Sequence, residues 1–292
     1  MSEAWRVSLH GGHSGEFCAH ARGRLEEVIE AAIERGYRVF GVSEHAPRYG
    51  EEFLYQEEVE RGIRVEDLEE SFADYAVRVE EMVGKYGADL EILKGFEAEV
   101  VPAEGYVEVM RGLKERYKLD YMVGSVHYVR GIGIDMDEGD FVRALESCGG
   151  LEGLLLEYYG AVEEMVVRLC PEVVGHLDVV RKYANRFGSL RFPSVERAVG
   201  RVLEVVFQSG GILEVNTAPY RRGEEVPYPE PWILEMARER GVEVCFGDDS
   251  HGPQEVGVGL ERARRYIWEL GFRRIVVLHR GEGGVEKRVV EL

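Results

Sequence analysis

Short β-branched or aromatic runs alternate with amphipathic helical patterns along almost the whole chain. Each helical pattern repeats apolar residues at the spacing of one helix face. Strands that alternate with helices favour a parallel sheet covered by helices, because parallel neighbours need a crossover connection. The chain is therefore predicted to be an α/β protein. The predicted strands lie at 6–9, 38–43, 90–101, 120–126, 173–175, 212–215 and 242–246, and a further apolar run lies at 275–278.

The number of strand and helix units bears on the domain organisation. The units follow one another without a low-complexity tract or a strong linker, and 292 residues is an ordinary length for one barrel. A single closed barrel domain over residues 1–292 is predicted in preference to two domains. The acidic stretch 48–64 lacks helical or strand periodicity and is expected to form a long loop or lid.

Histidines follow the predicted strands. Seven of the eight histidines lie at or beyond the C-terminal end of a predicted strand. In an α/β barrel these ends meet on one face, where active sites are built, and neutral imidazole is the commonest metal ligand. The pattern predicts a metal site on that face. The seven are His10, His13, His20, His45, His127, His176 and His251, whereas His279 lies on the last apolar run.

Carboxylates at strand ends add to this expected ligand set. Glu97 lies near the end of the third predicted strand, and Asp249 follows the seventh. Asp249 and His251 are two residues apart, so their side chains are expected to point to the same side. A carboxylate can bridge two cations and offset their charge. For Glu99 a solvated or ion-paired carboxylate is a plausible alternative.

The net charge of −19 limits the class of partner. Binding to a nucleic-acid backbone rests on clustered Lys and Arg, so no nucleic-acid partner is expected. A small anionic substrate is compatible with this charge, because divalent cations reverse the local field of a pocket. The chain shows no secretory leader pattern and no stretch of the ~20 apolar residues that span a bilayer. A cytoplasmic protein without a membrane partner is expected.

The four cysteines are widely spaced. Cys18, Cys148, Cys170 and Cys245 form no CxxC pair, which argues against a zinc knuckle and against a disulfide framework. Cys148, Cys170 and Cys245 are expected to fill the core. Cys18 lies near the histidine cluster, but burial is the better prediction for it too.

The polar residues gather in seven short segments. In chain order these are HGGHSGEFCAHA, SEHAP, GFEAE, GSVH, VVGHLD, EVNT and GDDSH. Together they span nearly the whole chain and resemble the polymerase and histidinol phosphatase (PHP) family. Segments similar to HSGEFC and SEHAPR are familiar in the monofunctional histidinol-phosphate phosphatases of that family.

The resemblance implies a distorted (βα)7 barrel, similar to a TIM barrel, with two or three divalent metal ions, usually zinc, manganese or iron. It also implies hydrolysis of a small phosphate monoester, with L-histidinol phosphate of histidine biosynthesis as the expected substrate. Carried over residue by residue, it implies a bridging role for Glu97. The first metal would be held by His10, His13, Glu97 and Asp249, the second by Glu97, His127 and His176, and the third by His20, His45 and His251.

The first segment departs from the family pattern. The family usually opens with HxH, whereas this chain has His10-Gly11-Gly12-His13. In a regular strand, residues three apart point to opposite faces, so both histidines can bind one cation only if the backbone bulges. Two glycines allow such a bulge most easily. The prediction for His10, unlike that for His13, depends on this bulge.

The expected reaction is in-line attack of a metal-bound hydroxide on phosphorus, without a covalent phosphoenzyme. Glu97 and Asp249 are predicted to act through the metals. A metal-bound water or a histidine such as His251 is the expected proton source for the leaving oxygen. Asp178 and Glu44 each have two readings, because either carboxylate could orient a ligand histidine or form a salt bridge.

Arginines are expected to bind the phosphate, because a planar guanidinium suits its non-bridging oxygens. Arg221 and Arg222 are the first candidates, together with Asn216 just before them, and Arg181 is the second.

The amine and imidazole of histidinol require an acidic or aromatic pocket. The stretch 48–64 and Tyr128, Tyr158 or Tyr159 are the expected contributors to it.

Three other functions stay open. A barrel of the amidohydrolase class also opens with paired histidines, although it often bridges its metals with a modified lysine where this chain has Glu97. A nucleotide phosphatase or 3′ exonuclease of the PHP family is the second, and the acidic charge disfavours polymer binding. An inactive metal-binding scaffold is the third. The sequence makes no prediction of oligomeric state.

Overall fold

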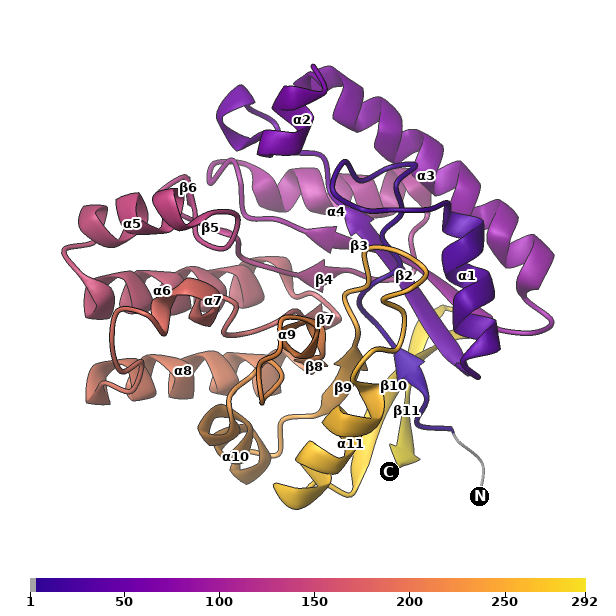
Figure 1. Ribbon diagram of the computed structural model, residues 1–292. Coiled ribbons are helices and arrows are strands. Elements are labelled where there is room, and N and C mark those ends of the chain that lie inside the picture. The colour runs from indigo at the N-terminus through magenta and orange to yellow at the C-terminus, as the bar shows by residue number, and fades with distance from the viewer. Residues whose placement is uncertain (1–3) are drawn as a thin grey trace.

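The computed structural model describes residues 4–292 and is built on a seven-stranded parallel sheet (Figure 1). The sheet order is β1-β2-β3-β4-β7-β8-β9. The N–H of Leu9 donates to the carbonyl of Phe246 at 2.8 Å, so β9 meets β1 and nearly closes the barrel. The predicted α/β barrel is confirmed. Its strands are β1 (Val7–Ser8), β2 (Val39–His45), β3 (Glu91–Ala98), β4 (Val123–Gly124), β7 (Val173–Val174), β8 (Ile212–Asn216) and β9 (Val244–Gly247).

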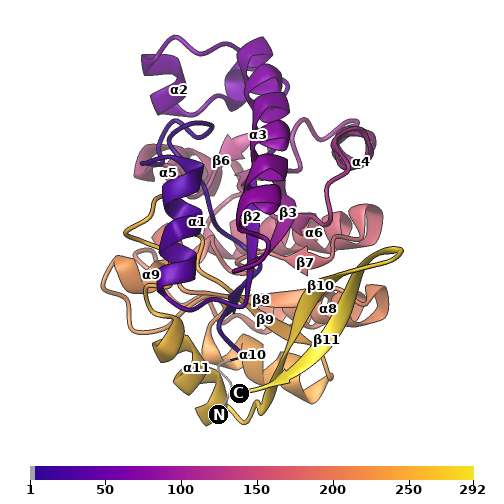
Figure 2. The ribbon, with the colours of Figure 1, turned by 90° about the vertical axis from the view of Figure 1, so that its right-hand side faces the viewer.

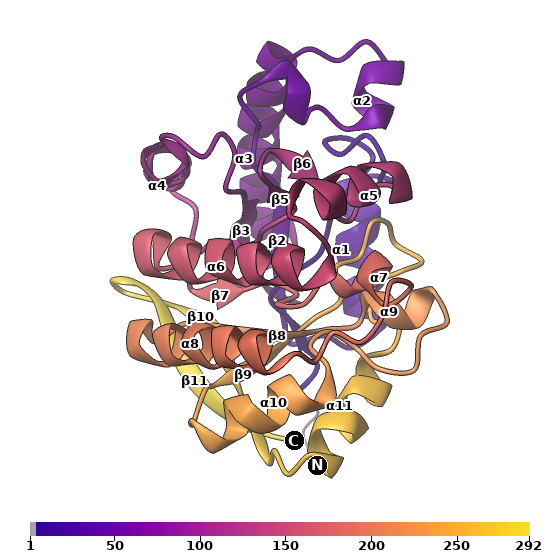
Figure 3. The ribbon, with the colours of Figure 1, turned by 90° about the vertical axis from the view of Figure 1, so that its left-hand side faces the viewer.

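Helices cover the outside of the barrel. In Figure 2, α1 and α3 lie side by side on one flank, and in Figure 3, α6 and α8 lie side by side on another. No helix within residues 4–292 combines the length and the apolar character needed to cross a membrane. The helices are α1 (Leu25–Glu34), α2 (Gln56–Glu60), α3 (Val65–Tyr86), α4 (Tyr106–Tyr117), α5 (Glu138–Ser147), α6 (Leu151–Leu169), α7 (Arg181–Ala184), α8 (Pro193–Ser209), α9 (Ala218–Arg221), α10 (Pro231–Glu239) and α11 (Leu260–Glu269).

Helix α8 illustrates why these segments are helical. It begins at Pro193, whose fixed backbone angle suits a first helical residue, and Gly210 ends it in the left-handed conformation. Its buried residues recur three and four apart, so one apolar face packs on the barrel. They are Val195, Ala198, Val199, Val202, Leu203 and Val206.

A C-terminal hairpin covers the end of the barrel where the strands begin. The predicted apolar run at 275–278 is the centre of β10 (Arg274–Gly281), which pairs antiparallel with β11 (Gly284–Glu291) outside the main sheet (Figure 2). His279 lies 2.6 Å from Glu91, the first residue of β3. The hairpin therefore leaves the opposite end of the barrel free for a site.

The acidic stretch 48–64 is more ordered than the expected loop. It contains the 3₁₀ turn Glu51–Phe53 and helix α2, which stands above α5 in Figure 3. Arg48 is buried, forms an ion pair with Glu58 and donates to the carbonyl of Phe53 at 2.9 Å. These bonds tie the start of the stretch to the 3₁₀ turn and to α2, which local periodicity does not reveal.

The fourth predicted strand is much shorter than 120–126. Only Val123–Gly124 pairs with the neighbouring strands, and the chain then forms a hairpin of β5 (Tyr128–Val129) and β6 (Ile132–Gly133). This hairpin begins directly after His127. Strand β4 therefore ends just before His127, at the end of the barrel where the predicted site lies.

Two of the four cysteines are not fully buried. Cys18 and Cys245 are buried, whereas Cys148 is half-buried and Cys170 is exposed. The core prediction is wrong for Cys170 because this residue follows the last turn of α6 in a left-handed conformation on the surface.

Candidate metal centre

The histidines predicted to follow strands converge at one end of the barrel. His45 is the last residue of β2, and His127 and His176 follow β4 and β7 within three residues. The tips of these strands bring together side chains from distant parts of the sequence. Four groups of three or four potential ligands have all their ligand atoms within 4.8 Å of one another, and between them they contain Cys18, His10, His13, His20, His45, Glu97, His176, Asp249 and His251.

The HxxH segment brings both of its histidines to the same carboxylate. The Nε2 atoms of His10 and His13 lie 4.0 and 3.7 Å from Oδ1 of Asp249. Gly11 has φ +145° and Gly12 has φ +78°, so both glycines adopt backbone angles that other residues rarely take. Residues 10–13 lie beyond the end of β1, so the expected strand bulge is replaced by an irregular segment in which the two glycines let both imidazoles face Asp249.

Gly11→Ala is expected to destabilise the fold by about 1–3 kcal/mol and to weaken metal binding. A Cβ at this position would overlap Oδ1 of Asp248 and lie 3.0 Å from the backbone nitrogen of Ser250. Urea denaturation and metal content measure the two effects. Gly62→Ala is the matched control, because Gly62 also has a positive φ but open space around it. Equal losses in both variants would show that the overlap is unimportant.

Glu97 lies at the centre of the cluster. Its Oε1 lies 3.0 Å from Nε2 of His176 and 3.4 Å from Nε2 of His10, and its Oε2 lies 2.8 Å from Nδ1 of His45. Burial alone would raise the pKa of this carboxyl, but His10 and His127 outweigh burial and hold the pKa well below its usual range. An ionised carboxylate that lies between several imidazoles in this way can bridge two cations.

His127 and His176 form the second group with Glu97. Their Nε2 atoms are 3.2 Å apart, and both lie within 3.4 Å of Oε1 of Glu97. Burial opposes protonation of His127, yet Glu97 and Glu99 raise its pKa to about 10. The negative field that holds a proton there would equally favour a divalent cation.

The third group contains His20, His45 and His251, together with Cys18. The Nε2 atoms of His20 and His45 are 3.4 Å apart. Burial lowers the pKa of His20 to about 4, helped by the charge of His13, and burial also lowers the pKa of His45 and His251. These imidazoles are therefore neutral at pH 7 and keep a lone pair available for a metal.

Buried nitrogen atoms without partners test whether the residues fit metal ions. Nε2 of His10 and Nε2 of His13 have no hydrogen-bond partner among the residues that the structure describes, although both side chains are fully buried. A buried polar atom without a partner costs about 1–3 kcal/mol. Coordination of a cation would remove this cost at both nitrogens. The residues therefore fit divalent ions.

Three buried glutamates lie behind the ligand histidines and face their Nδ1 atoms. A carboxylate in this position holds the ring and directs the lone pair of Nε2 toward the centre. The pairs are His10 with Glu214 at 3.0 Å, His127 with Glu99 at 2.7 Å, and His13 with Glu44 at 3.3 Å. Of the two readings for Glu44, the structure shows the histidine-orienting one. The solvated reading of Glu99 is wrong, because only 4% of this residue is exposed.

Glu214 is the functional candidate that sequence reasoning missed. It accepts from the backbone N–H of His176 at 2.6 Å and from Nδ2 of Asn216 at 2.9 Å, and it is fully buried. A charged residue inside the apolar run 212–215, two positions before Asn216, was the available signal, because alternate strand residues share a face.

Glu214→Gln is expected to weaken metal binding by roughly 10–100-fold. Glutamine has the same size, but it removes the charge that faces His10 and His176. Chelator competition on the purified protein measures the affinity. Glu243→Gln, which removes a surface partner of Lys287, is the control. An unchanged affinity in Glu214→Gln would assign this carboxylate to packing alone.

A cavity of about 750 Å³ opens over the metal-ligand cluster. Arg221, Arg222 and Lys182 contribute positive charge to its lining, and Tyr228 contributes an aromatic ring. Negative charge comes from the predicted stretch 48–64, from the segment between β6 and the first turn of α5, which was not predicted, and from the loop after β9. The acidic lining residues outside the ligand cluster are Glu57, Asp135, Asp137, Asp140 and Glu255.

Several predicted substrate-binding residues are held away from this cavity. The Arg181 guanidinium is buried, donates to Glu224 at 2.8 Å and to the carbonyl of Pro227 at 2.9 Å, and does not line the cavity. Asn216 donates to Glu214 and lies beneath the lining. Asp178 lies 3.4 Å from Arg181, so the structure shows its salt-bridge reading.

The aromatic residues around the cavity also differ from those expected. Tyr158 and Tyr159 are buried in the main core. The Tyr128 hydroxyl donates to the carbonyl of Phe53 at 3.0 Å, and Tyr128 does not line the cavity. Tyr55, from the stretch 48–64, lines it instead. The predicted stretch contributes, but through a different tyrosine.

Comparison with known families gives a direct result. The profile of the PHP domain matches residues 9–218, which is well over half of the chain. The chain belongs to the PHP domain family. The match begins one residue before His10 and ends beyond Asn216, so it spans most of the segments predicted to supply metal ligands, and Asp249 and His251 follow it.

Individual relatives agree with this PHP membership. A Schizosaccharomyces pombe protein named probable histidinol-phosphatase is 36% identical over 95% of this chain and 91% of its own length. A crystal structure of a candidate histidinol phosphatase from Listeria monocytogenes superposes with a TM-score of 0.75 at 27% identity, covering 88% of this chain and 99% of that one. The Lactococcus lactis histidinol phosphate phosphatase, solved with zinc, L-histidinol and phosphate, has the same fold, with a TM-score of 0.71, 18% identity and coverage of 97% and 99%.

Proposed function

We propose that the chain is a cytoplasmic, single-domain, metal-dependent phosphatase that hydrolyses L-histidinol phosphate to L-histidinol and phosphate in histidine biosynthesis. One observation carries the proposal: the cavity of about 750 Å³ has metal-ligand groups in its lining, with both guanidinium and carboxylate groups around them. The name of the S. pombe relative and the zinc, L-histidinol and phosphate of the L. lactis structure support the choice of substrate.

Two or three divalent ions, zinc, manganese or iron, fit the proposed ligand sets. When bound, such ions supply Lewis acidity and a nucleophilic water that ionises near neutral pH. The protein's own side chains balance the charge of the ions and orient the imidazoles. Glu97 and Asp249 offset the positive charge, while Glu214, Glu99 and Glu44 keep the imidazoles oriented. The ligand sets proposed are His10, His13, Glu97 and Asp249, then Glu97, His127 and His176, then His20, His45 and His251.

His251 fits a ligand role better than the role of a proton donor. Its Nδ1 lies 3.0 Å from the backbone carbonyl of Asp249, and an Nδ1–H donated there leaves the lone pair on Nε2. Burial and the charge of His13 lower the pKa of His251, so the ring does not carry the extra proton that a general acid needs. We therefore place His251 among the ligands of the third metal.

We propose Arg222 as the phosphate-binding residue, because its side chain holds less of the surrounding structure in place than that of Arg221. Arg221 donates to the carbonyls of Asp248 and Asp249 and so holds the loop after β9 in place. Arg222 lines the cavity, and within residues 4–292 its guanidinium donates to the side chains of Glu224 and Tyr228. A guanidinium at the mouth of the cavity can form two parallel bonds to phosphate oxygens.

The acidic lining suits the cationic part of the substrate. Histidinol carries an amine and an imidazole, and a nucleoside monophosphate carries neither an aliphatic amine nor a comparable positive charge. Asp135 and Asp140, from the loop after β6 and from α5, are proposed to face that amine across the cavity. These carboxylates explain why an acidic protein would prefer this ester over an anionic nucleotide.

Arg222→Ala is expected to raise KM for histidinol phosphate about 10-fold or more, because a hydrogen bond to a charged group contributes about 1.5–3 kcal/mol. Steady-state kinetics measures the change. Arg265→Ala removes an exposed arginine of α11 and is the control. A normal KM in Arg222→Ala would exclude this residue from phosphate binding and leave Arg221 or Lys182 for that role.

The function is tested by turnover of histidinol phosphate beside AMP, glycerol phosphate and a short oligonucleotide, with zinc, manganese and iron added one at a time. We expect histidinol phosphate to have the highest kcat/KM. Preference for AMP or the oligonucleotide would retain the phosphoesterase class and reject histidinol phosphate. Bound metal without any turnover would favour the inactive scaffold.

A further inference from the structure

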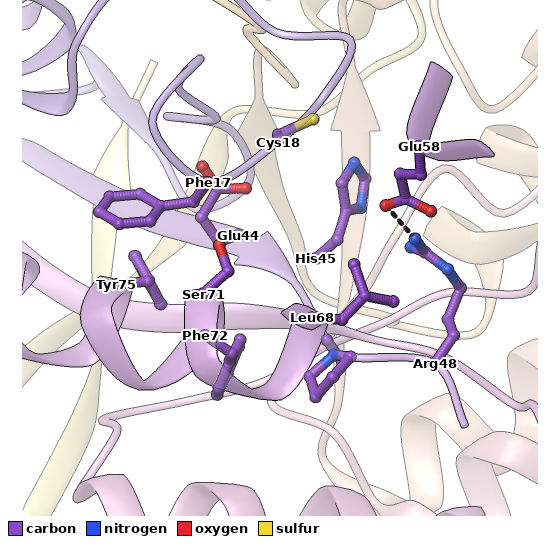
Figure 4. Close-up of a pocket in the computed structure, with 12 residues that line it drawn as sticks. Phe17, Cys18, Glu44, His45, Arg48, Glu58, Leu68, Ser71, Phe72 and Tyr75 are labelled. Carbon is purple, nitrogen blue, oxygen red and sulfur yellow. Dashed lines mark hydrogen bonds and ion pairs between the residues drawn. The ribbon is translucent and has the colours of Figure 1, made fainter. Parts of the chain in front are cut away.

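Cys18 lies within the third group of metal ligands. Its Sγ and the ligand nitrogens of His20, His45 and His251 are all within 4.8 Å of one another. Figure 4 shows the cysteine above His45, with its sulfur on the side of the imidazole. The short turn from Ser14, whose carbonyl accepts from the N–H of Cys18 at 2.9 Å, places the sulfur there.

Packing does not account for this position. Cys18 is 5% exposed, yet it belongs to neither hydrophobic cluster of the described residues, whereas Cys245 is part of the main one. The small pocket of about 20 Å³ beside Cys18 is lined by apolar side chains such as Phe17 and Phe72 and also by the polar groups of Glu44, Arg48 and Glu58. A buried sulfur among ligand nitrogens and charged groups is not where an apolar residue gains most from burial.

The geometry points to Cys18 as the fourth ligand of the third metal, with its thiolate beside His20, His45 and His251. A tetrahedral site with bonds of roughly 2.1–2.3 Å has ligand atoms roughly 3.4–3.8 Å apart. The 3.4 Å between the Nε2 atoms of His20 and His45 already matches that value. The remaining ligand atoms lie within 4.8 Å of one another, so side-chain rotations have to bring them closer. The inference rests on the proposed metal centre.

A thiolate ligand would set this site apart from the other two. Their proposed ligands are imidazole and carboxylate groups, which accept manganese, iron and zinc alike. A thiolate with three imidazoles is a softer, closed set that favours zinc and excludes manganese. The third metal is then held by protein alone, and it acts on the phosphate through its charge and through the positions of His45 and His251.

Zinc K-edge absorption on the wild-type protein loaded with zinc tests the ligation without a variant. We expect zinc–sulfur scattering at about 2.3 Å. Its amplitude should correspond to about one sulfur per protein molecule, shared over all the bound zinc ions. Spectra fitted by nitrogen and oxygen alone would overturn the inference. The same sample is assayed with histidinol phosphate. If the sample is active but shows no sulfur signal, Cys18 is rejected as a metal ligand and the proposed function stands.

Cobalt substitution of Cys18→Ser and Cys245→Ala provides the matched comparison. Wild-type protein and Cys245→Ala are expected to show a thiolate-to-cobalt charge-transfer band and to bind the same number of ions. Cys18→Ser should lose the band and bind zinc at the third site at least roughly 10-fold more weakly. Persistence of the band in Cys18→Ser, or its absence from all three proteins, contradicts the assignment. Circular dichroism establishes that each variant is folded.

Discussion

Glu97→Gln is expected to lower kcat/KM for histidinol phosphate by roughly 1000-fold or more. The carboxylate of Glu97 is the only side chain of the described residues that lies within 3.4 Å of His10, His127 and His176 and also within 2.8 Å of His45. Glutamine keeps the shape but removes the charge that holds neighbouring cations together. Charge stabilisation by such a site is several kcal/mol, and about 4 kcal/mol corresponds to a factor of 1000.

Kinetics and metal analysis of the same preparation check this prediction. Glu91→Gln is the matched control, because Glu91 begins the same strand, β3, and pairs with His279 at the opposite end of the barrel. We expect Glu91→Gln to retain normal turnover and normal metal content. If Glu97→Gln kept more than a tenth of wild-type kcat/KM, Glu97 would be an ordinary buried carboxylate and the bridging role would be wrong.

Removal of metal by a chelator is expected to abolish turnover and to lower the melting temperature. Without cations the fully buried Nε2 atoms of His10 and His13 have no hydrogen-bond partner in the described part of the chain, and the low pKa of Glu97 and Asp249 keeps negative charge beneath the cavity. A ligand present at a hundred times its Kd stabilises the folded state by about 2.7 kcal/mol. For a protein of this size that change corresponds to roughly 4–5 °C.

Differential scanning calorimetry before and after dialysis against chelator measures the shift. Zinc, manganese and iron are then returned separately, and we expect both turnover and melting temperature to recover. Magnesium is the control, because it prefers oxygen ligands and binds imidazole poorly. Full turnover in protein shown by elemental analysis to be free of metal would refute the metal-dependent reaction.

Local patterns predicted the barrel and the residues of the site. Alternation of apolar runs and amphipathic helices is a property of neighbouring residues, so 38–43 and 242–246 could be identified as strands β2 and β9 without any tertiary information. The position of a histidine after a strand is equally local, and parallel strands all end on one face. His45, His127 and His176 were therefore predicted to meet, and the structure brings them together.

The predictions that the structure did not confirm have a common cause. The hairpin of β10 and β11 closes the far end of the barrel through contacts such as His279 with Glu91, which are 188 positions apart. Arg181 comes soon after His176 in the sequence and was therefore predicted to bind phosphate. In the structure its guanidinium donates hydrogen bonds to Glu224 and to the carbonyl of Pro227. Neither outcome is encoded in local spacing, because each depends on which distant partner occupies the space.

The sequence by itself determined the fold class and the metal-binding chemistry of this protein, since periodicity and strand-end position are both short-range properties. Only the tertiary structure decided which carboxylate stands behind each imidazole, which arginine reaches the cavity, and that Cys18 lies among ligands. Glu214 meets His10 across 204 positions. Such pairings depend on the exact closure of the barrel, which brings the tips of β1, β8 and β9 together.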